Sequence, residues 1–197
     1  TLEVVFRGSI NTLDDDPIEN IAHKYVNDPS MTADGEGETD SPRVEITYGG
    51  ILISKVDTSA TGGPLGGARF EVYASNQPYA SDCSTGQPTG SALSFNGTTQ
   101  FNTDDVTGKV AIPGVYVTST DNGSNAGATS RCYFVREVRA PYGFILPTGN
   151  AAVSPVTVTA RATNSASFDV RIVNTRQTVP TLPLTGAAGQ ILALIGG

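Results

Sequence analysis

Short apolar runs separated by turn-forming residues constrain the fold of this chain more than any other feature. Six of them follow one another at regular spacing, at residues 51–56, 68–74, 108–112, 132–138, 156–160 and 168–174. Valine, isoleucine and threonine, which favour strands, are frequent in the runs, and glycine, proline and asparagine, which favour turns, lie between them. No helical period of useful length precedes the last residues. The pattern predicts an all-β chain whose strands form an antiparallel β-sandwich.

The same pattern divides the chain into three parts. From residue 49 to 175, the number and spacing of the strands predict an immunoglobulin-like sandwich. Three further runs lie upstream, at residues 2–11, 18–26 and 43–48. Because three strands cannot close a sandwich, we expect residues 1–48 to be the last strands of a second sandwich that begins earlier. Residues 176–197 begin with a stretch rich in proline and threonine, which we expect to form a tether.

The charge of the chain excludes one class of partner. Its net charge is −7 at pH 7, whereas a surface that binds nucleic acid is basic. The acidic stretches 14–16 and 34–40 lack the ligand spacing of a calcium loop, so we expect them to keep a surface protein soluble and predict no metal or other cofactor. The chain has a single histidine, His23, and no phosphate-binding glycine loop or metal-ligand spacing. We therefore do not expect an enzyme that acts on an external substrate.

Two cysteines, Cys83 and Cys132, form an even count in a chain whose composition suits an exported protein. We predict a disulfide between them, with two separate thiols as the alternative. The bond would close a loop of about 50 residues, which stabilises a fold by about 4 kcal/mol in the chain-entropy model. Thiolate catalysis is not expected, because the only histidine lies far away in the sequence.

Three polar residues fall on strand faces that are otherwise apolar. Successive strand residues point to opposite sides of a sheet, so Lys55 continues the row of Ile51 and Ile53 toward the core. By the same alternation, Asn174 ends the apolar row of the last run and Glu137 ends that of the fourth. An unpaired lysine or glutamate is costly to bury, so the presence of both on core faces calls for an explanation.

The three residues suit an autocatalytic cross-link. Desolvation lowers the pKa of a lysine and raises that of a carboxylic acid, which favours a neutral amine beside a protonated acid. Lys55 Nζ can then attack the Asn174 carboxamide carbon while Glu137 hydrogen-bonds the carbonyl oxygen and shuttles protons. Ammonia leaves and an internal isopeptide bond remains, and close packing supplies about 7–11 kcal/mol of the barrier. The alternative is a salt bridge between Lys55 and Glu137, with Asn174 as a satisfied core amide.

Four stretches of sequence surround these residues. They are Ile53-Ser-Lys-Val-Asp57, Leu65-Gly-Gly-Ala-Arg-Phe-Glu-Val-Tyr73, Tyr133-Phe-Val-Arg-Glu-Val-Arg-Ala-Pro-Tyr-Gly-Phe144 and Ile172-Val-Asn-Thr175. In type and order they resemble the signatures of a collagen-adhesin B-type (CnaB-like) domain, over residues 50–175. The third is similar to the pilin E-box, whose glutamate is catalytic, although Val138 stands where threonine is commoner. The resemblance implies that Glu137 promotes a bond between Lys55 and Asn174.

The upstream segment carries a weaker resemblance. Ile18-Glu-Asn-Ile-Ala22 is similar to the end of a collagen-adhesin A-type (CnaA-like) domain, in which the asparagine accepts its own lysine. Asn20 fits that place. Its donor lysine and acid are expected upstream of residue 1, so Asn20 would be an orphan acceptor here. A solvent-facing strand asparagine is the alternative.

A short motif near the end of the chain bears on function. It is formed by Leu182, Pro183, Leu184, Thr185 and Gly186. An apolar run, 191–195, follows it. The motif resembles the LPXTG sorting signal of Gram-positive surface proteins, which a sortase cleaves between threonine and glycine. In that family the threonine carbonyl then passes to an amine on peptidoglycan or on another pilin subunit. An apolar segment of about 20 residues with a basic tail is needed for a complete signal, and this run is shorter.

Together the two resemblances imply a sortase-assembled major pilin at the surface of a Gram-positive bacterium. Its implied partners are a class C (pilus) sortase, neighbouring pilin subunits joined through Thr185, and peptidoglycan through a housekeeping sortase. The alternative is a wall-anchored adhesin that does not polymerise and uses the B-type domain as a stalk. An acceptor lysine in a Val-x-x-x-Pro-Lys type motif would discriminate the two. Only Lys24, Lys55 and Lys109 are present, none of them after a proline, so we expect that lysine upstream.

Overall fold

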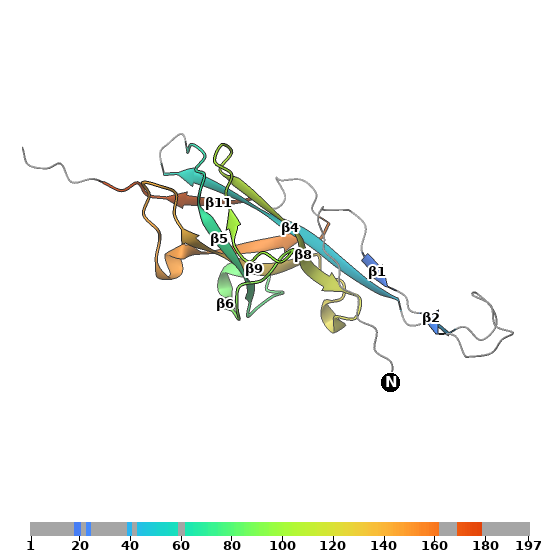
Figure 1. The fold of residues 1–197 in the computed structure, drawn as a ribbon. Coiled ribbons are helices and arrows are strands. Elements are labelled where there is room, and N and C mark those ends of the chain that lie inside the picture. The colour runs from blue at the N-terminus through green and yellow to red at the C-terminus, as the bar shows by residue number, and fades with distance from the viewer. Residues whose placement is uncertain are drawn as a thin grey trace, which may run out of the picture.

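The computed structural model describes residues 18–20, 23–24, 39–40, 43–58, 62–161 and 169–178. Strands form most of the ordered structure (Figure 1). They are β1 (Ile18–Asn20), β2 (His23–Lys24), β3 (Thr39–Asp40), β4 (Val44–Asp57), β5 (Arg69–Ser75), β6 (Pro88–Thr89), β7 (Phe101–Asn102), β8 (Lys109–Ser119), β9 (Ser130–Arg139), β10 (Val153–Thr159) and β11 (Asp169–Asn174). Three short 3₁₀ helices lie between strands, at η1 (Cys83–Thr85), η2 (Gly123–Asn125) and η3 (Gly149–Ala152).

Two β-sheets face each other, as the alternating pattern predicts. The first, called here the β4 sheet, contains β1, β4, β8 and β11. The second, the β9 sheet, has the order β10-β9-β5-β6, and β7 also pairs with β5. A separate short pair joins β2 to β3. The all-β sandwich expected from the sequence is confirmed.

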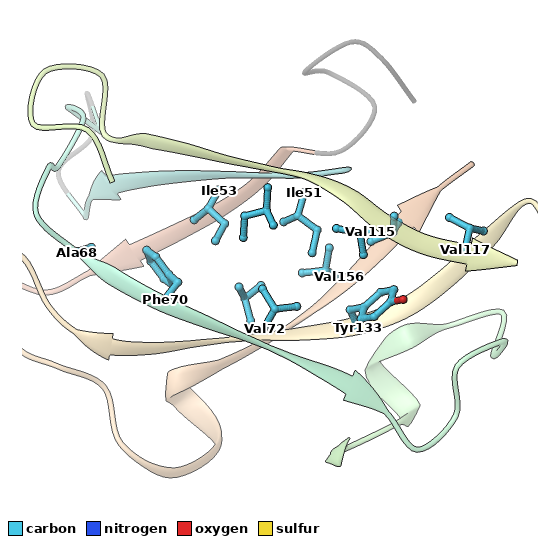
Figure 2. Packing of buried hydrophobic residues seen from close by; sticks show 12 residues of the cluster. Ile51, Ile53, Ala68, Phe70, Val72, Val115, Val117, Tyr133 and Val156 are labelled. Carbon is cyan, nitrogen blue, oxygen red and sulfur yellow. The ribbon is translucent and has the colours of Figure 1, made fainter. Parts of the chain in front are cut away.

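The core lies between the two sheets, where apolar side chains from both meet (Figure 2). Its buried members are Ile51, Ile53, Ala68, Phe70, Val72, Ile112, Val115, Val117, Tyr133, Val135, Val156 and Val158. Most are β-branched residues at every second strand position, so one face of each strand is apolar. At about 25 cal/mol per Å² of apolar surface removed from water, this burial is the main stabilising term of the fold.

One pairing in the described part of the chain departs from the antiparallel expectation. β11 runs parallel to β4, with Ile172 opposite Lys55 and Asn174 opposite Asp57. All the other paired strands among the described residues are antiparallel. The strand that precedes β11 in sequence, β10, belongs to the facing sheet. The chain therefore crosses from one sheet to the other between β10 and β11, and β11 does not pair with β10 as an antiparallel hairpin.

Residues 43–48 and 51–56, expected as two separate strands, form one strand. β4 runs unbroken through the pair of glycines, with register shifts against β8 at Thr47/Tyr48 and Gly49/Gly50. The boundary expected between residues 48 and 49 therefore falls inside β4. Glycine is needed at position 49 for lack of space, because a Cβ there would lie 2.3 Å from the Thr159 carbonyl oxygen.

The close approach of β10 to Gly49 generates a prediction. Gly49→Ala forces the end of β10 away from β4, and we expect the free energy of unfolding to fall by about 1–3 kcal/mol. Urea unfolding followed by circular dichroism measures the change. Gly127→Ala is the matched control, because a Cβ at Gly127 meets nothing within 4 Å. Equal unfolding midpoints for the two variants would contradict the steric argument.

Candidate functional site

Three polar side chains are buried at one end of the core. Lys55 is 0%, Asn174 1% and Glu137 3% exposed. Lys55 and Asn174 come from the adjacent strands β4 and β11 of one sheet, and Glu137 comes from β9 of the facing sheet. Because Asn174 lies two residues beyond the partner of Lys55 in the parallel register, both side chains point to the same side.

Two of the three side chains are in direct contact. Asn174 Nδ2 donates a hydrogen bond of 2.7 Å to Glu137 Oε1. The second oxygen of the carboxyl group, Glu137 Oε2, and the carboxamide oxygen, Asn174 Oδ1, are buried and accept no hydrogen bond. Buried polar atoms in proteins are nearly always paired, so two orphans on neighbouring groups mark a site where packing alone does not explain the residues.

The Lys55 amine hydrogen-bonds to backbone. Nζ lies 3.1 Å from the Ile172 carbonyl oxygen and 3.5 Å from that of Val56. Within the described residues it makes no ion pair with Glu137, so the salt bridge considered as the alternative is not formed in this structure. An amine held by carbonyl oxygens alone keeps its nitrogen close to the β4–β11 seam.

Burial changes the ionisation of both reactive groups. Desolvation lowers the pKa of Lys55 to about 8, although the charge of Glu137 acts in the opposite direction. Desolvation raises the pKa of Glu137, opposed by the charge of Lys55 and the hydrogen bond from Asn174. The lowered pKa makes the neutral, nucleophilic form of the Lys55 amine far more accessible near pH 7 than it is for a free lysine.

The predicted disulfide is present. Cys83 in η1 is bonded to Cys132 in β9, and the described residues contain no free cysteine. The bond anchors the segment between β5 and β6 to the β9 sheet. Close to it, Cys83 Sγ lies 3.2 Å from Thr157 Oγ1 on β10.

Other predicted residues are placed only in part. Asn20 lies in β1 opposite Val44, and only its backbone is described. The sorting motif, residues 182–186, lies outside the described residues. In the part of the chain that the structure covers, no helix is long and apolar enough to cross a membrane, and no cluster of three metal-ligating side chains is found.

Sequence reasoning missed one contact at the edge of this site. Arg176 pairs with Asp57, through two nitrogens 2.8 and 2.7 Å from Asp57 Oδ2. Asp57 is 4% exposed and would be costly to bury alone. The sequence did hold a hint of this pairing, because Asp57 lies two residues after Lys55 and Arg176 lies two residues after Asn174.

The chain is similar to two known fimbrial proteins. This chain is 30% identical over 211 residues to fimbrial subunit type 2 of Actinomyces naeslundii. The alignment covers 100% of this chain and 39% of that protein. The crystal structure of the Actinomyces fimbrial adhesin FimA matches with a TM-score of 0.65 and 29% identity, over 86% of this chain and 61% of that one. The chain therefore spans well under half the length of the type 2 subunit.

A more distant structure supports the fold. The full-length major pilin SpaD of Corynebacterium diphtheriae matches with a TM-score of 0.56 and 22% identity, over 86% of this chain and 39% of that one. No family model matches the chain.

The disulfide generates a testable prediction. Thiol labelling of the denatured, unreduced protein should detect no free cysteine, because Cys83 and Cys132 are bonded to each other. Reduction should lower the free energy of unfolding by up to about 4 kcal/mol, since the bond restricts the unfolded chain. The Cys83→Ser/Cys132→Ser double variant should unfold at the same denaturant concentration with and without reductant. Labelling of both thiols in the unreduced wild type would refute the bond.

Proposed function

We propose that this chain, a homologue of fimbrial subunits, belongs to a structural subunit of a covalently polymerised pilus on a Gram-positive cell surface. In this proposal an internal bond between Lys55 and Asn174 stabilises the sandwich, and a pilus sortase joins the subunit to its neighbour through Thr185. Two similar proteins are called a fimbrial subunit and a fimbrial adhesin. Since the chain covers 39% of the type 2 subunit, assembly is inferred for the whole protein from this part of it.

The observation that carries the proposal is the buried group of Lys55, Glu137 and Asn174. Burial of all three gives no stabilisation that apolar residues would not give better, since two of their polar atoms remain without partners. A reaction among them explains the arrangement. Joining Lys55 to Asn174 converts an ionisable amine into a neutral amide and so removes the cost of burying the lysine charge.

The reaction balances without any added reagent. The neutral Nζ of Lys55 attacks the carboxamide carbon of Asn174, a new C–N bond forms, and the old C–N bond breaks. The proton lost by the amine passes to the departing nitrogen, which leaves as ammonia. No oxidant, metal or nucleotide enters this sequence.

Glu137 has a role at each stage. Its Oε1 already contacts Nδ2 of Asn174, the nitrogen that leaves, so the carboxyl group can deliver a proton to it. From the sequence, Glu137 was expected to contact the carbonyl oxygen of Asn174, but in the structure that oxygen has no hydrogen-bond partner. A half-turn of the carboxamide exchanges its oxygen and nitrogen, and a protonated Glu137 then donates to the oxygen and polarises the carbon for attack.

Intact mass tests the cross-link. Folded wild-type protein should be lighter than its sequence mass by one ammonia, or by one ammonia and two hydrogens when the disulfide is kept. Glu137→Gln removes the acid with little change of size and should restore the ammonia, as should Glu137→Ala. Glu71→Gln makes the same chemical change on β5, away from the triad, and should keep the wild-type mass.

Peptide mapping locates the bond. Digestion should yield one branched peptide that joins the Lys55 segment to the Asn174 segment. A wild-type protein that folds, forms its disulfide and still has the full mass would reject the proposal.

The sorting motif supports assembly from a separate direction. Pro183 fixes its own backbone angle and favours an extended shape at Leu182, as suits a peptide in an enzyme groove. In the proposal a pilus sortase forms a thioester with Thr185 and transfers it to a lysine of the next subunit. A housekeeping sortase then attaches the finished fibre to peptidoglycan. One of the similar structures is called a fimbrial adhesin, and we extend adhesion to this protein as part of the same proposal.

Incubation with a sortase tests the second bond. With a pilus sortase and a partner domain that bears an acceptor lysine, this chain should give one covalent adduct through Thr185. Thr185→Ala should abolish the adduct, whereas Thr181→Ala, which lies just outside the motif, should not. Because none of its three lysines follows a proline, the chain alone should not form ladders. Ladders from the chain alone, or cleavage at another site, would contradict the proposal.

A further inference from the structure

An ion pair lies directly beyond the buried triad. Nε and Nη2 of Arg176 approach Oδ2 of Asp57 at 2.8 and 2.7 Å. The Asp57 side chain is 5% exposed, whereas Arg176 is largely open to solvent, and Thr58 Oγ1 also donates to Asp57 Oδ1 at 3.3 Å. The Arg176 guanidinium also lies over the ring of Phe144, 5.4 Å from its centroid. Asp57, Arg176 and Phe144 are called here the β4–β11 clamp.

The clamp joins the same three chain segments as the triad. Asp57 follows Lys55 by two residues on β4, and Arg176 follows Asn174 by two residues at the end of β11. Phe144 lies in the segment after β9, the strand that carries Glu137.

Backbone hydrogen bonds hold these segments together at the same point. The Ile145 amide donates to the Thr175 carbonyl at 2.9 Å, and the Gln177 amide donates to that of Gly143 at 2.8 Å. Any movement of β11 along β4 therefore has to break the clamp.

The apolar residues of β11 do not fix its register against β4 by themselves. The strand has six residues, and its core-side apolar residues among those described are Val170 and Ile172. A shift by one residue would turn them away from the core and is strongly disfavoured. A shift by two residues would keep the apolar row inward, yet it would carry Asn174 about 6.6 Å along the strand, away from Glu137.

The ion pair separates these two registers. Val170 and Ile172 face the core in both, so the alternation of apolar residues by itself does not distinguish the two registers. The contact between Asp57 and Arg176 exists in only one, because a two-residue shift moves Arg176 by the same distance. Asp57 is also the direct Cα partner of Asn174 in the observed register.

We propose that Asp57 and Arg176 are positioning residues for the cross-link: their ion pair selects the register of β11 in which the Asn174 carboxamide meets Glu137 and Lys55. This inference rests on the isopeptide bond proposed above. Arg176 pairs with Asp57, and the charge of Asp57 also acts on the Lys55 amine, whose pKa it raises against the larger effect of desolvation. The ion pair raises the fraction of folded chains in which the Lys55 amine, the Asn174 carboxamide and the Glu137 carboxyl group are already in contact. A small displacement of these groups lowers the reaction rate strongly.

The rate of cross-linking in newly made chains tests the inference. The full chain is synthesised in a cell-free reaction, samples are quenched in denaturant at successive times, and intact mass gives the fraction that has lost ammonia. Folding is followed in parallel by protection of Cys83 and Cys132 from thiol labelling. Arg176→Ala should form the bond about tenfold more slowly than wild type once folded. Arg176→Lys, which keeps the charge, should recover most of the rate.

Two further measurements separate positioning from general stabilisation. Gln177→Ala changes the neighbouring exposed side chain but keeps the backbone hydrogen bond, and should react at the wild-type rate. Sodium chloride at 1 M should slow the wild type, because it screens the partly exposed ion pair, and should leave the rate of Arg176→Ala unchanged.

The outcomes are distinct. Folded Arg176→Ala that cross-links as fast as wild type would overturn the inference while leaving the bond itself intact. Equal salt dependence in both proteins would overturn it as well. A folded wild type that never loses ammonia would instead refute the isopeptide proposal on which the inference rests.

Discussion

The burial of Lys55 is the constraint on which the rest of this sandwich depends. An ammonium group removed from water is among the costliest groups that a core can hold, and here the lysine lies at one end of an otherwise apolar cluster, next to two other buried polar residues. The fold meets this cost in part with backbone carbonyls that accept from Nζ and with a lowered pKa. Conversion of the amine into an amide would remove the cost completely. The lysine is thus an unfavourable choice for an inert core and a suitable one for a core that reacts once.

The proposed cross-link would require accuracy from a strand that is individually weak. β11 is short and has few apolar anchors, yet the proposed bond needs Asn174 in one register. A charged pair and two backbone hydrogen bonds lie immediately beyond Asn174. Elsewhere, the disulfide ties η1 to β9. Covalent or ionic contacts therefore hold segments that the hydrophobic core alone specifies poorly.

Strict alternation made the core of this protein predictable from sequence. Because strand side chains alternate with a period of two, the inward direction of Lys55, Glu137 and Asn174 could be counted from their apolar neighbours. The even cysteine count predicted the disulfide. The prediction that was wrong concerned one short segment, the break between two strands at Gly49-Gly50. Gly49-Gly50 has the composition of a turn, but β8 and β10 pack against it and hold the chain in one continuous strand.

Contacts between residues far apart in the chain could not be predicted from the sequence, for a different reason. The pair of Asp57 and Arg176 depends on the parallel register of β4 and β11, and nothing in either short segment states that register. The orientation of the Asn174 carboxamide was also out of reach, because it depends on whether Glu137 accepts or donates a hydrogen bond. Both features arise only when three separate strands are brought together.

The parallel pairing of β4 and β11 has a mechanical consequence. β4 begins at Val44 and β11 ends at Asn174, and because the two strands point the same way, these two points lie at opposite ends of the pair. Tension applied between them acts along the strands and loads their hydrogen bonds together, in shear. An antiparallel pair pulled from neighbouring ends would open one bond at a time. This strand order makes the domain resistant to stretching along the line of the chain.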